Sequence, residues 1–192
     1  MPDTTIDRRE LLPRLFPDPG RWLMVSGLAG AARDTAALTS DADYLYTMGG
    51  AMGAAVSIGL GMALAAPNAP VAVITGDGEL IMNLGSLTTV ASMMPGNLSI
   101  VCIDNGQHGE TGGQPGHTAR RTDLAAIAQG AGLVSVMTVS HPEQLAEAAR
   151  FLTGAPAPRF LLARVLPGPP CDWKRDLDPA NCRLRFRNAR GL

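Results

Sequence analysis

The sequence of 192 residues has few cysteines, few aromatic side chains and almost no net charge. Its three cysteines, Cys102, Cys171 and Cys182, are odd in number and form no CxxC pair, so neither a disulfide framework nor a zinc site is predicted. Aromatic residues make up 4%, which leaves little surface for stacking bases. The formal net charge of −1 gives no basic field that would attract nucleic acid or anionic lipid. We therefore expect no nucleic-acid partner and no membrane partner.

Long apolar runs are also missing from the sequence. No stretch is long enough to span a bilayer, and the charged N-terminal segment MPDTTIDRRELLPRLF lacks the apolar core of a signal peptide. We therefore expect a protein of the reducing cytoplasm. A content of 46% hydrophobic residues predicts a sizeable, mostly aliphatic core in a single domain over residues 1–192, with a polar C-terminal tail over 168–192.

Short apolar runs alternate with helical stretches along the chain. Strands are predicted in six segments: 21–27, 43–50, 70–78, 98–106, 133–139 and 158–167. Helices are predicted between them, including one continuous helix over 80–96, and one short helix in the tail. Runs such as PVAVITGDG are apolar at successive positions, as central parallel strands are. The predicted fold class is therefore α/β, a doubly wound parallel sheet with helices on both faces.

Polar residues stand at the ends of two consecutive predicted strands. Gly76-Asp77-Gly78 ends one strand and Asp104-Asn105-Gly106 ends the next, roughly 25 residues later, which is the length of one helix plus one strand. If these two strands are neighbours in a parallel sheet, Asp77 and Asn105 lie together at the edge where such sheets bind ligands. Carboxylate and amide oxygens suit Mg²⁺, and the glycines let backbone N–H groups approach an anion. The alternative is a pair of ordinary strand–helix turns, in which Gly, Asp and Asn are common.

The stretches that flank these turns add a family resemblance. TMGGAMGAAVSIGLGMALA before the first turn, the GDG motif itself, and DNGQHGETGGQP after it resemble the diphosphate-binding domain of thiamine-diphosphate-dependent 2-oxo acid decarboxylases. Within that family the similarity is to the sulfopyruvate and phosphonopyruvate decarboxylases. It extends over most of Ser26 to Pro115, and the length of the chain is that of a separate beta subunit in that family.

The resemblance implies a set of cofactor contacts. Asp77, Asn105 and the Gln107 carbonyl would ligate Mg²⁺. In the GGAMG turn, the Gly50 carbonyl would accept a hydrogen bond from the pyrimidine ring, and Met52 would be the apolar wedge that bends thiamine diphosphate. The cofactor-binding set as a whole is Ser26, Gly27, Gly50, Ala51, Met52, Gly76, Gly78, Glu79 and Gly106.

The implied reaction converts a small 2-oxo acid to an aldehyde and CO₂, with the hard chemistry supplied by the cofactor. His108 and Glu110 lie on the loop that would face the reacting carbon, so they are candidates for proton transfer, with a loop-capping or partner-contacting role as the alternative. Ala51, Glu79, Asp104, Glu110 and His117 depart from the residues usual in the family. A carboxylate near the pocket would repel a sulfonate or phosphonate unless it is paired, so the choice of 2-oxo acid stays open.

The family also needs a glutamate that protonates the pyrimidine ring, and it comes from a different domain. The sequence offers no second α/β domain, so we expect a hetero-oligomer with a second subunit that carries the pyrimidine-binding domain and this glutamate. Two alternatives stay open: a carboligase subunit, and a non-catalytic subunit for cofactor binding or assembly. A nicotinamide fingerprint in GLGMALA, residues 59–65, is not favoured, because it lies inside a predicted helix.

Overall fold

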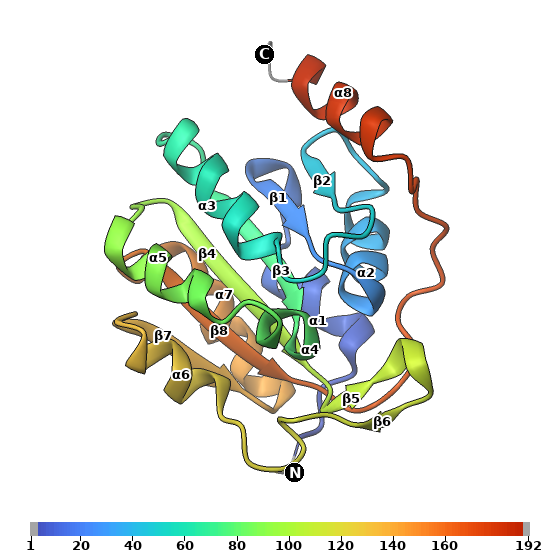
Figure 1. Cartoon of the computed structure of the whole chain (residues 1–192), viewed down its shortest axis with the longest axis vertical. Coiled ribbons are helices and arrows are strands. Elements are labelled where there is room, and N and C mark those ends of the chain that lie inside the picture. Colours follow the sequence, from blue (N-terminus) through green and yellow to red (C-terminus); the bar gives the residue numbers. More distant parts are fainter. Residues whose placement is uncertain (1–3, 190–192) are drawn as a thin grey trace.

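Six parallel strands form the central sheet (Figure 1). The computed structural model describes residues 4–189. The strands, in their order across the sheet, are β2 (Leu45–Thr47), β1 (Leu23–Ser26), β3 (Val71–Gly76), β4 (Leu98–Asp104), β8 (Arg159–Arg164) and β7 (Ser135–Val139). All residues of β1 and β4 are buried, which explains why these runs are apolar on both faces. The predicted fold class is confirmed.

Helices cover both faces of this sheet (Figure 1). One face carries α1 (Arg8–Leu15), α2 (Ala29–Thr39) and α7 (Leu145–Gly154), and the other carries α3 (Ala55–Ala65), α5 (Gly85–Met93) and α6 (Leu124–Gly130). Successive residues on a strand point to opposite faces. Ala72 and Ile74 of β3 therefore belong to the core under α1, whereas Val71 and Val73 belong to the core under α3.

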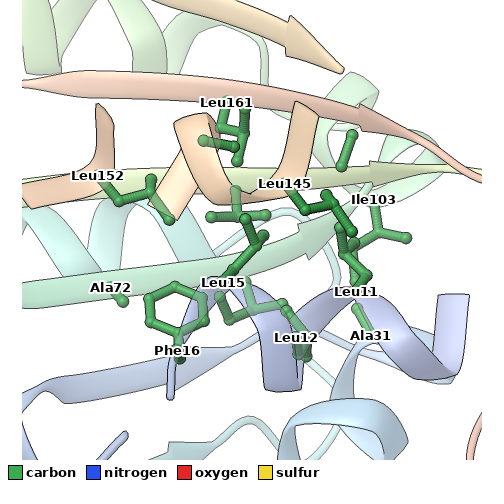
Figure 2. Packing of buried hydrophobic residues seen from close by; sticks show 14 of the residues in the cluster. Leu11, Leu12, Leu15, Phe16, Ala31, Ala72, Ile103, Leu145, Leu152 and Leu161 are labelled. Carbon is green, nitrogen blue, oxygen red and sulfur yellow. The ribbon is translucent and has the colours of Figure 1, made fainter. Parts of the chain in front are cut away.

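The core under α1 and α7 is mostly aliphatic (Figure 2). Leu11, Leu12 and Leu15 of α1 are fully buried, or nearly so, and share this core with Leu145 and Leu152 of α7. Burying one such leucine contributes roughly 1.5–3 kcal/mol. This packing holds the helices that lie behind the sheet, so that the carboxyl ends of the strands keep a fixed position.

The strand order creates a crevice between β1 and β3. From β1 the chain passes through α2 to β2 on one side, and then through α3 on the opposite face to β3 on the other side. The loops that leave the carboxyl ends of β1 and β3 therefore diverge. Open α/β sheets bind ligands at such a switch point.

The helix expected over residues 80–96 is a wrong prediction. A short helix, α4 (Asp77–Ile81), begins directly after β3, and α5 starts separately at Gly85. Asn83 lies in the break, where its side-chain amide donates to the Gly53 carbonyl at 3.1 Å. Asn and Gly are weak helix formers, and this long-range hydrogen bond favours the interruption.

The C-terminal segment runs back along the molecule to β2 (Figure 1). It ends in α8 (Pro179–Ala189), longer than the short helix expected there, whose Cys182 and Phe186 are buried. The backbone N–H of Thr47 on β2 donates to the Cys182 sulfur at 3.2 Å, and the Phe186 ring stands edge-on to Tyr46. The tail is polar in sequence, but it covers the edge strand of the sheet.

The remaining elements are short. A two-stranded hairpin pairs β5 (Gln107–His108) with β6 (Gln114–Pro115), and single turns of 3₁₀ helix occur at η1 (Pro19–Arg21), η2 (Gly109–Thr111) and η3 (Pro142–Gln144). Within residues 4–189, none of the helices has the length and apolar character needed to cross a membrane.

Candidate active site

A cleft of about 910 Å³ opens at the carboxyl ends of β1, β3 and β4. Most of its walls come from the start of α2, the turn after β3, the loop after β4 and the C-terminal segment, with Arg8 of α1 and Met52 of the turn before α3 added. The lining residues include Leu28, Ala29, Gly30 and Ala31; Gly76, Asp77, Gly78 and Glu79; Asn105, Gln107, His108 and Glu110; and Gly168, Pro169, Pro170 and Arg175.

The two polar turns singled out in the sequence lie side by side at this cleft. β3 pairs in parallel with β4, and Gly76 stands opposite Ile103, so the predicted proximity of the two strands is confirmed. Asp77 is the first residue of α4 and Asn105 is the first residue after β4. The Asn105 side-chain oxygen accepts from the Gln107 N–H at 3.1 Å, which fixes the turn and leaves a second lone pair free.

Thr118 joins the two turns, and no motif in the sequence predicted this contact. Its hydroxyl donates to Asp104 Oδ1 at 2.7 Å and lies 3.1 Å from Asp77 Oδ2. Two carboxylates from different strands thus share one hydroxyl group. Thr118 lies in the loop that follows the β5–β6 hairpin and belongs to no recognisable motif, so only the folded chain reveals this contact.

Asp77 is a buried acid in an unfavourable environment. Burial, and to a lesser degree the neighbouring Asp104, raises the pKa of Asp77 from 3.8 to about 6. A bound cation would favour its charged form. No group of three His, Cys, Asp or Glu side chains within residues 4–189 could hold a metal ion, so an ion at Asp77 would need amide and carbonyl oxygens and oxygens from a ligand. This donor set fits Mg²⁺ bound to a diphosphate.

Glu79 ties the turn after β3 to the start of α2. One of its carboxylate oxygens accepts from the Leu28 N–H at 3.0 Å and from the Thr75 hydroxyl at 3.1 Å. The other oxygen is buried and has no hydrogen-bond partner within residues 4–189, and burial raises the pKa of this carboxyl group. A Cβ atom on Gly27 would overlap the Glu79 carboxylate, so a larger residue at position 27 would displace that carboxylate.

The start of α2 presents free backbone donors to the cleft. Leu28 at the N-cap provides no side-chain cap, and Ala29 has a left-handed backbone with φ of +56°. The first N–H groups of a helix have no partner inside the helix, and they favour an anion. The helix therefore begins at the cleft with an end suited to a phosphate group.

The glycine turn before α3 places one apolar side chain at the cleft. Gly50 and Gly53 have positive φ values of +148° and +90°, and the Met52 N–H donates to the Gly50 carbonyl at 3.0 Å. Met52 is 48% exposed and lines the cleft. An exposed methionine here suits contact with a ligand or with another chain, because it gains little from the protein's own core.

The β5–β6 hairpin carries the two candidates for proton transfer. The His108 ring lies against Gly78, where an added Cβ would stand 3.4 Å from Nδ1. The Glu110 carboxylate lies 3.7 Å from the guanidinium of Arg33 on α2. Both side chains border the cleft, so the hairpin forms the wall that faces α2 and α4.

The predicted site residues divide into two groups. Those that line the cleft are Met52, Gly76, Asp77, Gly78, Glu79, Asn105, Gln107, His108 and Glu110. Those that lie behind or beside it are Ser26, Gly27, Gly50, Ala51 and Gly106. Ser26 is fully buried at the end of β1, and its hydroxyl has no hydrogen-bond partner among the residues that the structure describes. Besides Thr118, sequence reasoning missed Arg8, Arg33 and Arg175, which also line the cleft and belong to no motif.

Comparisons with known proteins agree with this geometry. Residues 28–161 match the family model of the thiamine pyrophosphate enzyme, C-terminal TPP binding domain. The chain is 33% identical to sulfopyruvate decarboxylase subunit beta of Methanocaldococcus jannaschii, over 95% of this chain and 96% of that subunit. It is 35% identical to phosphonopyruvate decarboxylase of Streptomyces viridochromogenes over 92% of this chain, but it spans only 44% of that protein.

A solved structure shows the same fold. The 2-oxoglutarate:ferredoxin oxidoreductase from Magnetococcus marinus superposes with a TM-score of 0.64, over 93% of this chain and 73% of that chain. The sequence identity is 17%, so this likeness concerns the fold alone.

Proposed function

The chain belongs to the thiamine pyrophosphate enzymes, and from this premise we propose that it is one subunit of a thiamine-diphosphate- and Mg²⁺-dependent decarboxylase. The substrate would be a 2-oxo acid of the sulfopyruvate or phosphonopyruvate type, and the products an aldehyde and CO₂. The observation that carries the proposal is the cleft in which Asp77, Asn105 and the start of α2 come together. The names of the two relatives support the same reaction class.

The residues of the cleft would divide the work of binding. Asp77, Asn105 and the Gln107 carbonyl would hold Mg²⁺, which would offset the negative charge of the diphosphate. The N–H groups of Gly78 and Glu79, and those at the start of α2, would donate to phosphate oxygens. When bound, thiamine diphosphate supplies a nucleophilic carbon and takes up the electrons released as CO₂ leaves.

The remaining side chains would position the reactants and move a proton. Met52 would contact the cofactor from one side. The Gly50 carbonyl would accept a hydrogen bond from the cofactor's amino group. The His108 ring lies against Gly78, in the turn after β3. Its imidazole would deliver a proton to the product carbon. Glu110 is the second candidate for this transfer. The hairpin and the C-terminal segment would keep bulk water away.

A second chain would complete the enzyme. The M. jannaschii relative is named as a subunit beta, and this chain spans 96% of its length. We propose that a partner supplies the pyrimidine-binding domain and the glutamate that protonates the cofactor, and that the cofactor binds between the two chains. The proposal places this complex in the reducing cytoplasm, where the three free cysteines would stay reduced.

The test is reconstitution. The chain, purified with the partner that copurifies with it, should release CO₂ from sulfopyruvate or phosphonopyruvate when Mg²⁺ and thiamine diphosphate are present. The chain alone should release almost none. Product analysis distinguishes an aldehyde from a carboligation product, and cofactor binding without turnover would favour an assembly role. Full activity of the isolated chain would refute the two-subunit arrangement.

A further inference from the structure

Two arginines line the cleft outside the residues assigned to the metal and the diphosphate. Arg33 comes from the second turn of α2, and Arg175 comes from the C-terminal segment. Both lie near Glu110 of the hairpin. The three charged groups therefore form one cluster, contributed by three distant parts of the chain.

The backbone just before Arg175 is held by two anchors, at Cys171 and Trp173. The Cys171 N–H donates to Asp34 Oδ1 at 2.8 Å, and the Trp173 indole N–H donates to Asp41 at 3.0 Å. Asp34 is itself held by a buried ion pair with Arg8, at 2.7 Å. These anchors hold the segment at the cleft, which lowers the entropy that ordering it would cost on binding.

Arg175 has a hydrogen-bond donor that pairs with none of the described protein groups. Its Nη1 atom is buried and has no hydrogen-bond partner in the part of the chain that the structure describes. Burial, and next the charge of Arg33, lower the pKa of Arg175 below its usual value. A nearby anion would therefore stabilise the charged form of Arg175.

Glu110 does not neutralise this cluster. Its carboxylate is 3.7 Å from Arg33, longer than a hydrogen bond, and both side chains are about half exposed. Two guanidinium groups share this cluster with Glu110, and Asp41, which accepts from the Trp173 indole, lies near Arg175. Arg8 is balanced by Asp34. Glu110 thus lies beside a cation without saturating it, and the Arg175 Nη1 atom, which has no partner within residues 4–189, is the donor that an anion could use.

We propose that Arg33 and Arg175 form a subsite for a second acidic group on the substrate, and that the enzyme prefers dianionic 2-oxo acids with a sulfonate, phosphonate or carboxylate at the far end. The inference rests on the proposed decarboxylase function and assigns its substrate selectivity to these two side chains. Guanidinium groups match such anions because each presents several N–H donors in one plane. Glu110, 3.7 Å from Arg33, would orient that guanidinium.

The experiment compares Arg33→Gln, Arg175→Gln and the double variant with wild type, each as the full chain with its copurified partner. Arg150→Gln is the matched control, because Arg150 is an exposed arginine on α7 that does not line the cleft. Each single change should raise the KM for phosphonopyruvate or sulfopyruvate about tenfold or more, as expected for the loss of one charge-assisted contact. The KM for pyruvate and the Kd of thiamine diphosphate should change less than about threefold, on the same scale. Arg33→Lys should recover part of the loss.

A binding measurement makes the result independent of turnover. Calorimetric titration with 3-phosphonopropionate, which cannot be decarboxylated in this way, should show binding that both glutamine variants weaken and that Arg150→Gln leaves intact. Propionate should bind weakly to every form. Melting temperatures check that each variant is folded.

Several outcomes would separate the two proposals. Equal binding of 3-phosphonopropionate by wild type and the double variant would overturn the subsite, as would glutamine variants that lose thiamine diphosphate and all substrates alike. In the second case the arginines serve the diphosphate, and the decarboxylase function stands. Arginine-dependent binding of the probe by a complex that decarboxylates no 2-oxo acid would support the subsite and refute the proposed function.

Discussion

Asp77 combines a structural cost with a proposed role in binding Mg²⁺. Its pKa is raised to about 6 by burial and by Asp104, whereas in the unfolded chain it would be near 3.8. Between these two pH values the folded state binds more protons than the unfolded state, so this group makes the metal-free protein less stable as the pH rises. The full difference corresponds to about 3 kcal/mol. A cation bound at the carboxylate would remove this cost.

The first prediction concerns this pH dependence. With EDTA present, Asp77→Asn should match the stability of wild type near pH 4 and exceed it by up to about 3 kcal/mol at pH 7. Urea unfolding at several pH values measures the difference. Glu147→Gln, an exposed acid on α7, is the control and should show no such trend. A difference between Asp77→Asn and wild type that does not change with pH would contradict the cause given for the raised pKa.

The second prediction concerns the steric pair formed by Gly27 and Glu79. Gly27→Ala alone should destabilise the protein by about 1–3 kcal/mol, because the new methyl group meets a buried carboxylate. In the double variant with Glu79→Ala, the methyl group gains space. The double variant should therefore lose about 1 kcal/mol less stability than the two single variants lose together. A double-mutant cycle with urea unfolding measures this coupling. Strictly additive losses would show that Glu79 does not impose glycine at position 27.

At the level of single residues, the sequence predicted the site residues that belong to motifs. Asp77 and Asn105 could be identified because glycine turns at strand ends have a local pattern. Thr118 could not, because it meets Asp77 and Asp104 only in the folded chain, and Arg175 could not, because it reaches the cleft from a distant part of the chain. Glu79 was noticed as unusual, but its hydrogen bond to the start of α2 depends on the sheet order.

Among the secondary-structure elements, the C-terminal segment has a role that its polar composition hides. It joins β8 to the edge strand β2 and is fastened to α2 through Asp34. Asp34 is 2% exposed and accepts hydrogen bonds from both Arg8 and Cys171. This one carboxylate therefore links α1, α2 and the segment that completes the cleft.

The third prediction tests that link. Asp34→Ala should cost about 3–5 kcal/mol of stability, because it leaves the Arg8 guanidinium buried without a partner. It should also release the segment 167–178, which limited proteolysis would detect as faster cleavage there. Arg9→Ala, which removes an exposed ion pair with Asp7, should leave both measurements nearly unchanged. Unchanged proteolysis of Asp34→Ala would contradict the anchoring role.

Prediction of the elements themselves succeeded where the hydrophobic pattern was strong. The six strands were recognisable because each is short and apolar, with turn residues at its ends. The break between α4 and α5 was missed, because a hydrogen bond from Asn83 to a distant turn helps to determine it. The hairpin β5–β6 was read only as a loop, since each of its strands has two residues.

For the molecule as a whole, the fold and the family followed from the sequence, and the complete active site did not. Alternation of strands and helices predicted the doubly wound sheet. The family resemblance is confirmed by the match over residues 28–161. The rest of the site is expected on a partner chain, and the chain spans only 44% of the phosphonopyruvate decarboxylase that it resembles. No pattern in this sequence describes that partner.

The central claim is that the turns after β3 and β4 together hold a divalent ion and a diphosphate. Mn²⁺ can replace Mg²⁺ and can be located by its anomalous scattering in crystals grown with thiamine diphosphate. We expect one strong anomalous peak at about 2.0–2.3 Å from a carboxylate oxygen of Asp77 and from Asn105 Oδ1, next to the diphosphate. Crystals of Asp77→Asn should show no peak there. A metal bound elsewhere, or a diphosphate bound away from these two turns, would contradict it.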